Sequence, residues 1–193
     1  VARSLQFPQT SIVVPPPVDW RRYRVHTSRR CITLMNVAEA KGGAVLVEIA
    51  RRMQDRKFLG VLGFRGEMVV DRTLPNLTYV ECRADVRGVY AETGILLMPS
   101  SYESWGRAGI EAMASGIPVV AHPTPGLRES LGDAGLFCDR DRIGDWVDTI
   151  RRLEDPGTYD AVSARCFERA RQLDPAEDLR RFGAFVAEIL GSE

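Results

Sequence analysis

Histidine, lysine and cysteine are scarce in this chain of 193 residues. It has two histidines and four cysteines, and among its 26 basic residues only Lys41 and Lys57 are lysines. The formal net charge is zero, so there is no electrostatic case for binding nucleic acid. The cysteines are widely spaced and form no Cys-x-x-Cys pair, so neither a zinc site nor a disulfide framework is indicated.

Long apolar runs and targeting signals are also missing. No apolar run approaches the ~18 residues of a membrane-spanning helix, and no signal peptide is recognisable. We therefore expect a cytoplasmic chain with at most peripheral membrane association. No Gly-x-Gly-x-x-Gly follows the first expected strand, which argues against a NAD-type dehydrogenase. The length suffices for one sizeable domain with a real core.

Short apolar runs alternate with amphipathic stretches from residue 31 onward. The expected strands are Cys31–Met35, Phe58–Leu62, Leu77–Val80, Ile95–Met98, Val119–Ala121 and Leu136–Cys138. The expected helices are Ala44–Gln54, Asp85–Glu92, a short helix ending near Gly116, a turn at Leu127–Leu131, Ile143–Glu154, Thr158–Leu173 and Ala176–Leu190. This alternation predicts an α/β fold: one Rossmann-like, doubly wound parallel sheet of about six strands, with helices on both faces.

The stretch from Pro99 to Pro118 carries the densest pattern. It reads as a polar loop and one short helix, with Ser104 as the expected N-cap and Gly116 as the C′ residue. A helix N-terminus at the carboxyl end of a parallel strand suits an anion. Glu103 and Glu111 bracket this helix start, roughly 8–9 Å apart along its axis. Each carboxylate can accept hydroxyl hydrogen bonds, which predicts one sugar ring for each.

The first expected strand is followed by a turn that contains Asn36, Lys41, Gly42 and Gly43. Glycines let a phosphate approach the backbone, and a lysine there supplies a positive charge. The turn therefore predicts a phosphate contact. The plain alternative is a solvated lysine in a glycine turn.

Pro-Ser-x-x-Glu…Gly…Glu-Ala-x-Ala-x-Gly-x-Pro-Val-Val, with its Glu-x7-Glu spacing, resembles the C-terminal half of a GT-B-fold, retaining glycosyltransferase of family 4, the "glycosyl transferases group 1" domain. The resemblance runs from about Cys31 to Asp141. It implies a half that binds a nucleoside diphosphate sugar of the UDP or GDP type and transfers a hexosyl group without a metal or other cofactor.

The resemblance also implies roles for individual residues. Glu103 and Lys41 would be catalytic: Glu103 would bind the transferred sugar or steady its developing oxocarbenium charge, and Lys41 would neutralise the departing diphosphate. Glu111 would accept the two ribose hydroxyls. The helix start would face the hexose and the β-phosphate, and its residues are Ser104, Trp105, Gly106 and Arg107. For Arg107, a solvated helix arginine is the open alternative.

One position departs from the family's pattern. Asn36 stands where the family often has an arginine, so one of two cations on the diphosphate is missing, and Arg65 or Arg107 would have to take over. A subgroup that reads Asn-Pro-x-x-x-Lys-Gly also resembles this turn. The departure favours a rival interpretation, a non-catalytic nucleotide-sugar-binding or scaffold module that pairs with a partner chain. A phosphate-using GT-B phosphorylase is the second rival.

The pattern and the resemblance together divide the chain into three segments. We expect residues 1–30 to be an interdomain linker, with a disordered leader as the alternative, because Pro15–Pro17 favour an extended chain. Residues 31–175 would be the nucleotide-sugar-binding domain, and 176–193 a C-terminal helix. That helix either reaches back to an N-terminal acceptor domain, in the same or another chain, or packs into this domain's core. Without the acceptor half we expect nucleotide binding but little or no transferase activity.

Overall fold

The computed structural model describes residues 11–64 and 66–190. In this part of the chain six parallel strands form one sheet in the order β3-β2-β1-β4-β5-β6. The strands are β1 (Cys31–Leu34), β2 (Phe58–Leu62), β3 (Leu77–Glu81), β4 (Thr93–Met98), β5 (Val119–Ala121) and β6 (Leu136–Phe137). Because the strand order reverses between β1 and β4, the expected doubly wound parallel sheet is confirmed.

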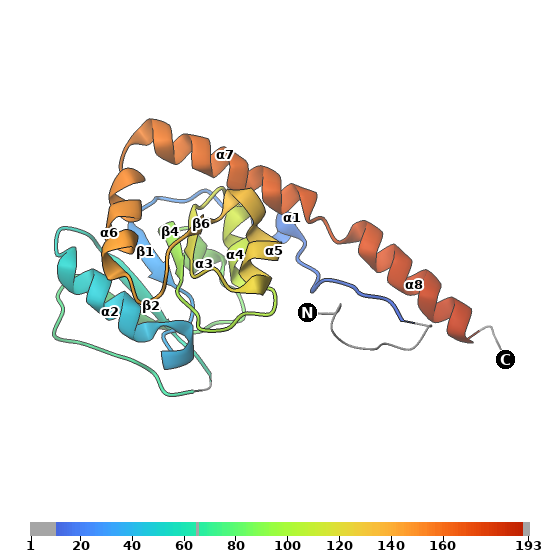
Figure 1. The fold of residues 1–193 in the computed structure, drawn as a ribbon, viewed down its shortest axis with the longest axis horizontal. Coiled ribbons are helices and arrows are strands. Elements are labelled where there is room, and N and C mark those ends of the chain that lie inside the picture. The colour runs from blue at the N-terminus through green and yellow to red at the C-terminus, as the bar shows by residue number, and fades with distance from the viewer. Residues whose placement is uncertain (1–10, 65, 191–193) are drawn as a thin grey trace.

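Helices cover both faces of this sheet (Figure 1). They are α1 (Trp20–Tyr23), α2 (Gly43–Arg52), α3 (Arg87–Tyr90), α4 (Arg107–Met113), α5 (Pro125–Leu131), α6 (Ile143–Arg152), α7 (Pro156–Gln172) and α8 (Ala176–Leu190), with the 3-10 turns η2 (Glu39–Lys41) and η3 (Gly132–Ala134). On one face α2 packs against α6, and on the other α4 packs against α7 and α1. The helices that follow β1 and β4 therefore lie on opposite faces of the sheet, as in other doubly wound folds.

The core forms where these helices meet the sheet. Leu46 and Ile49 of α2 are fully buried, as are Leu96 and Leu97 of β4 and Trp146 of α6. These positions recur at helical spacing in α2 and run continuously in β4, so the sequence periodicity alone was enough to locate them.

The helix after β4 begins later than the sequence predicts. Ser104 is not its N-cap: α4 starts at Arg107 behind Gly106, whose φ of 77° is left-handed and whose position has no side-chain cap. The predicted end is confirmed, because Gly116 is left-handed and the bonds from Gly116 N–H to Met113 and from Ile117 N–H to Ala112 form a Schellman motif.

The described part of the segment expected as a linker, residues 11–30, lies along the domain. Val18 is buried, and the amide of Val25 donates to Ser115 Oγ at 2.9 Å. The Trp20 indole and Arg21 both donate to Asp174, at 3.3 and 2.6 Å, which ties α1 to the junction of α7 and α8. Residues 1–10 of this segment lie outside the described residues.

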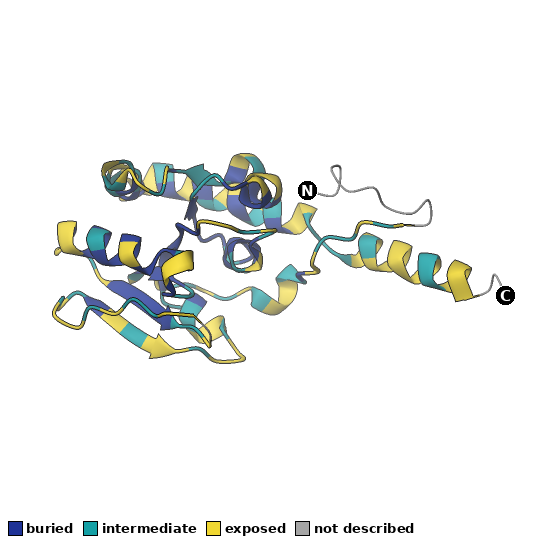
Figure 2. Cartoon of the chain, turned by 60° about the horizontal axis from the view of Figure 1, so that its bottom comes forward, coloured by how far each residue is buried: buried dark blue, intermediate teal, exposed yellow. Residues whose placement is uncertain are grey.

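The helix α8 extends away from the sheet (Figure 1), and none of its residues is buried (Figure 2). Leu179 and Phe182 are each 47% exposed and Ile189 is 50% exposed. Packing of this helix into the domain's own core, one of the two alternatives, is therefore wrong. Residues 191–193 of the expected helix lie outside the described residues.

Gly126, in the first turn of α5, lies so close to the loop after β4 that a Cβ atom would overlap the Glu103 carbonyl and the Ser104 backbone. We expect Gly126→Ala to lower the free energy of unfolding by about 2 kcal/mol, because backbone must move to admit the methyl group. Urea denaturation measures the change.

Gly144 provides the matched control, since it lies near the start of α6 and a Cβ added there would meet nothing within 4 Å. Gly144→Ala should be neutral or stabilise by up to about 1 kcal/mol, through helix propensity. Equal effects of the two substitutions would contradict the close approach at Gly126.

Candidate functional site

A cavity of about 230 Å³ opens between the carboxyl ends of β1 and β4, where the strand order reverses. Open α/β sheets bind their ligands at this place. Its lining comes from the two strand ends, the turn after β1 and the start of α4: Leu34, Met35, Asn36, Lys41, Leu96, Leu97, Met98, Ser100, Glu103, Gly106, Arg107 and Ala108. Of the ten predicted site residues, Asn36, Lys41, Glu103, Gly106 and Arg107 line it.

Lys41 and Glu103 meet in this cavity as an ion pair. Lys41 ends η2, Glu103 lies in the loop after β4, and their Nζ and Oε1 atoms are 2.6 Å apart. Ser100 Oγ also donates to Glu103 Oε1, at 3.0 Å. The carboxylate is the more enclosed partner, with 16% of its side chain exposed against 35% for the lysine. The amine is thus the group that can swing towards an incoming anion.

Gly42 and Gly43 follow Lys41 in the chain and do not line the cavity. Gly42 is left-handed, with φ of 93°, and a Cβ there would overlap the Pro99 ring. A Cβ on Gly43 would overlap the carbonyl of Val37. Gly42 therefore lets the turn after β1 lie directly against the loop after β4, and Gly43 lets that turn close on itself at Val37.

Arg140 was not singled out in the sequence, yet it holds these loops together. Its guanidinium donates to the carbonyls of Glu39 at 2.9 Å, Pro99 at 3.1 Å and Ala40 at 3.4 Å. The Arg140 amide donates to Nδ1 of His122 at 3.0 Å, which fixes the loop after β6 beside the end of β5. The side chain is 18% exposed, so this clamp is largely enclosed.

Glu111 lies outside the cavity lining, one helical turn beyond Arg107. Its carboxylate accepts from Tyr90 Oη at 3.0 Å and lies 3.5 Å from the Arg107 guanidinium, and 12% of the side chain is exposed. Burial, followed by the charge of Glu111, raises the pKa of Tyr90 well above its usual value. Tyr90 therefore remains a neutral hydrogen-bond donor to this carboxylate. Sequence reasoning did not find Tyr90.

The four predicted residues around the start of α4 fall into two pairs, and only one pair lines the cavity. Gly106 and Arg107 line the cavity, and Arg107 also donates to Tyr23 Oη at 3.4 Å. Ser104 is exposed and lines no part of the cavity. Trp105 faces a different cavity, beside Pro15–Pro17 and Ile110. The left-handed turn at Gly106 separates the two pairs, because it delays the helix until Arg107.

Asn36 uses its side chain to shape the turn. Its Oδ1 atom accepts from the Ala38 amide at 2.9 Å, an Asx-type contact. A Cβ on Gly63 would overlap this side chain, so the chain just after β2 also packs against it. Arg65, one of the two cations expected to substitute here, lies outside the described residues. Arg107 is the arginine among the lining residues of this cavity.

Metal-binding clusters and membrane-spanning helices are both absent from residues 11–64 and 66–190. These ranges contain no group of three or more histidine, cysteine, aspartate or glutamate side chains arranged to hold a metal ion. None of their helices is both long and apolar enough to cross a membrane.

The chain matches a known protein family over most of its length. The model described as "Glycosyl transferases group 1" matches residues 29–155. D-inositol 3-phosphate glycosyltransferase of Mycolicibacterium smegmatis is 38% identical over 88 residues, which cover 44% of this chain and 20% of that protein. O-antigen chain mannosyltransferase B of Escherichia coli is 33% identical over 90 residues, which cover 46% and 23%. The matched segments are thus about a fifth of these relatives' length.

Solved structures share the fold at low sequence identity. The sucrose-phosphate synthase of Thermosynechococcus elongatus aligns with a TM-score of 0.77 at 19% identity, over 93% of this chain and 53% of that one. Anabaena Alr3699/HepE, in complex with UDP and glucose, aligns with a TM-score of 0.76 at 18% identity, over 94% and 57%. This chain therefore spans little more than half of each of these structures.

The ion pair between Lys41 and Glu103 can be measured by a double-mutant cycle of Lys41→Met, Glu103→Gln and the double variant. We expect a coupling free energy of about 1 kcal/mol, since the pair is only partly enclosed. Urea denaturation supplies the four unfolding free energies. The exposed pair of Arg180 and Glu177 on α8 is the reference, and its coupling should be smaller. Strictly additive effects at residues 41 and 103 would refute the pair.

The raised pKa of Tyr90 predicts that the folded chain loses stability at alkaline pH. Because the pKa of Tyr90 is raised in the folded state, the neutral hydroxyl contributes fully to the free energy of unfolding below pH about 10. This contribution is lost as the pH rises further. The free energy of unfolding should therefore fall above pH about 10, and less steeply in Tyr90→Phe. Some slope should remain, because burial also raises the pKa of Tyr159, to about 12. Urea denaturation across this pH range decides, and parallel curves for both proteins would contradict the assignment.

Proposed function

The chain belongs to the glycosyl transferases group 1 family, and from this premise we propose that it is the donor-binding half of a retaining, metal-independent glycosyltransferase of family 4. It would hold a nucleoside diphosphate sugar of the UDP or GDP type while the hexosyl group passes to an acceptor. The observation that carries the proposal is the ion pair of Lys41 and Glu103, held in the cavity between β1 and β4.

The diphosphate would bind beside Lys41. Its ammonium group already lies 2.6 Å from a carboxylate, so a phosphate oxygen can replace Glu103 as its partner without a large movement. The lysine charge would then stabilise the negative charge that builds up on the diphosphate as the glycosidic bond breaks. With Asn36 occupied in its own turn, Arg107 is the lining residue placed to supply a second cation.

Glu103, released from Lys41, would face the sugar. Its carboxylate keeps the hydrogen bond from Ser100, so its orientation survives the exchange. It can accept hydroxyl hydrogen bonds from the hexose and oppose the positive charge that develops on the ring as the diphosphate departs. The acceptor hydroxyl would form the new glycosidic bond on the face that the diphosphate leaves and give its proton to the departing diphosphate oxygen, so the anomeric configuration would be retained.

Glu111 would accept the two ribose hydroxyls. The donors Tyr90 and Arg107 hold its carboxylate in place, and 12% of the side chain remains exposed to a ligand. Because Glu111 lies one turn beyond the cavity lining, the nucleoside would extend past Arg107 along α4. This arrangement assigns the sugar and the ribose to different carboxylates, one in the loop before α4 and one within that helix.

The acceptor half would join at the side of the domain where α8 leaves it. The exposed apolar residues of α8 supply a surface for contact, and Pro15–Pro17 lie beside the α7–α8 junction in one small cavity. Figure 1 shows this proline segment and α8 on the same side of the sheet. Transfer would take place between the two halves, so the isolated chain would bind nucleotide but transfer sugar poorly.

A non-catalytic binding module is the second candidate. Its support is Asn36, which brings no charge to the cavity and whose side chain already accepts a hydrogen bond from the Ala38 amide. Such a module would still bind nucleotide sugar, but the complete two-domain protein would transfer none.

Calorimetric titration of the chain with UDP, GDP and ADP tests donor binding. We expect at least one to bind, and Lys41→Met to weaken it at least about tenfold through loss of a charge-assisted contact. Glu111→Gln should instead reduce the preference for a ribonucleotide over its 2′-deoxy analogue.

Arg180→Gln, an exposed substitution on α8, is the control and should bind as the parent chain does. Absence of binding by all three nucleotides, or a Lys41→Met variant that binds as tightly as the parent, would refute the donor site.

A further inference from the structure

Arg140 lies in the loop after β6 and does not line the cavity between β1 and β4. Its Nη1 atom donates to the carbonyls of Ala40 and Pro99, at 3.4 and 3.1 Å. Its Nη2 atom donates to the carbonyl of Glu39 at 2.9 Å and to Oε1 of the same residue at 3.4 Å. These four contacts use all four N–H bonds of the two terminal nitrogens. We therefore expect Arg140 to act on a ligand through the segments that it holds.

The three carbonyls belong to the segments that carry the ion pair. Glu39 and Ala40 directly precede Lys41 in η2. Pro99 begins the loop after β4 that carries Glu103. A planar guanidinium with fixed donor directions bonds both segments at once, so it sets how the turn lies relative to the loop. The 2.6 Å contact between the Lys41 ammonium and the Glu103 carboxylate depends on that placement.

A second contact joins the same two segments without Arg140. The Ala40 carbonyl accepts from the amide and from the hydroxyl of Ser101, at 3.0 and 3.2 Å. Without the guanidinium the segments would therefore still touch, but the bonds to Glu39 and Pro99 would be lost. We expect removal of Arg140 to loosen the turn that carries Lys41 while the domain stays folded.

The backbone at Arg140 is itself fixed by its neighbours. The Arg140 amide donates to Nδ1 of His122, directly after β5, at 3.0 Å. The carbonyl of the preceding residue, Asp139, accepts from the indole of Trp146 at 2.7 Å, and Trp146 is fully buried in α6. The guanidinium is thus presented from a rigid base, and no ligand is needed to place it.

We propose that Arg140 is a positioning residue of the donor site, which acts through Lys41 without contacting the ligand. This inference rests on the proposed donor function. Arg140 holds the turn after β1 in the place where the lysine would meet the diphosphate, so less ordering is left for the ligand to bring about and the affinity is higher. Glu111 is held separately, by Tyr90 of α3, so the ribose contact should not depend on Arg140.

A binding cycle of Arg140→Met, Lys41→Met and the double variant tests this role by calorimetry. The probe is the one among UDP, GDP and ADP that binds the parent chain most tightly. We expect Arg140→Met to weaken binding at least about fivefold in the parent chain. In the Lys41→Met chain the same change should have less than about a twofold effect. Equal losses in both chains would overturn the proposal, because they would show that the whole site had loosened.

Two further readouts separate positioning from a general structural loss. The preference for a ribonucleotide over its 2′-deoxy analogue should be unchanged in Arg140→Met, since Glu111 keeps its bond from Tyr90. Arg140→Lys keeps the charge but loses the planar fork that bonds both segments, so it should weaken binding nearly as much as Arg140→Met. Parent affinity in Arg140→Lys would show that charge alone is enough, and the positioning role would be wrong.

Arg142→Met is the matched control. Arg142 lies in the same loop, with 72% of its side chain exposed, and pairs with Asp145 at 3.1 Å. This variant loses the same charge as Arg140→Met but no bond to the segments of the ion pair, so it should bind nucleotide as the parent does. An equal loss of affinity in Arg142→Met and Arg140→Met would contradict the proposal.

The last measurement needs no nucleotide. The coupling free energy between Lys41 and Glu103, obtained by urea denaturation, should fall by at least about half when Arg140 is replaced by methionine. Unchanged coupling would overturn the positioning role even in a chain that binds nucleotide. If none of the three nucleotides binds the parent chain, the proposed function fails, whereas this urea cycle still decides whether Arg140 positions the pair.

Discussion

The contact between the turn after β1 and the loop after β4 supports every other feature of the candidate donor site. It brings Lys41 to Glu103 across 62 positions of sequence, with 2.6 Å between their charged atoms. Gly42 permits the approach because it has no Cβ to meet Pro99, and Arg140 secures it from the far side through three backbone carbonyls. Since backbone groups rather than mobile side chains receive these bonds, the geometry exists before any ligand arrives.

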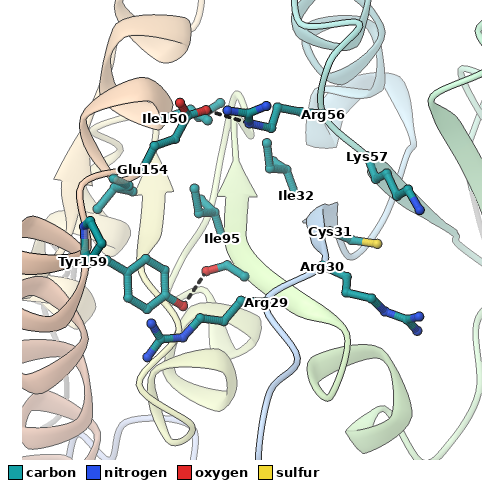
Figure 3. Close-up of a pocket in the computed structure, with 13 residues that line it drawn as sticks. Arg29, Arg30, Cys31, Ile32, Arg56, Lys57, Ile95, Ile150, Glu154 and Tyr159 are labelled. Carbon is teal, nitrogen blue, oxygen red and sulfur yellow. Dashed lines mark hydrogen bonds and ion pairs between the residues drawn. The ribbon is translucent and has the colours of Figure 1, made fainter.

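Two cavities lie at opposite ends of β1 and β4. These strands are parallel, so their carboxyl ends meet at the candidate donor cavity and their amino ends at a second cavity, lined by Ile32, Ile95, Ile150 and Tyr159 among others (Figure 3). The linings of the two cavities differ. Lys41 and Glu103 form an ion pair in the candidate donor cavity, whereas the interior at the other end is apolar.

Much of this could be predicted from the sequence. Strands such as Ile95–Met98 are uninterrupted apolar runs, and buried parallel strands require such runs, so the sheet followed directly. Lys41, Glu103 and Glu111 stood out because their spacing sets charged groups around one crossover and one helix start. Gly116 was recognised as a helix end because a left-handed cap selects glycine within a few positions. Each of these signals is local, which is why a linear chain displays it.

The rest was decided by tertiary structure. Arg140 and Tyr90 reach their partners from 101 and 21 positions away, and no local pattern marks an arginine or a tyrosine for such a contact. Ser104 looked like a cap, but the left-handed Gly106 moved the helix start to Arg107. Sequence alone thus determined the fold class through periodicity, and it singled out Lys41 and Glu103, which the structure brings together in the candidate site. Which of the predicted residues share a cavity depended on packing between distant segments, and that exists only once the chain has folded.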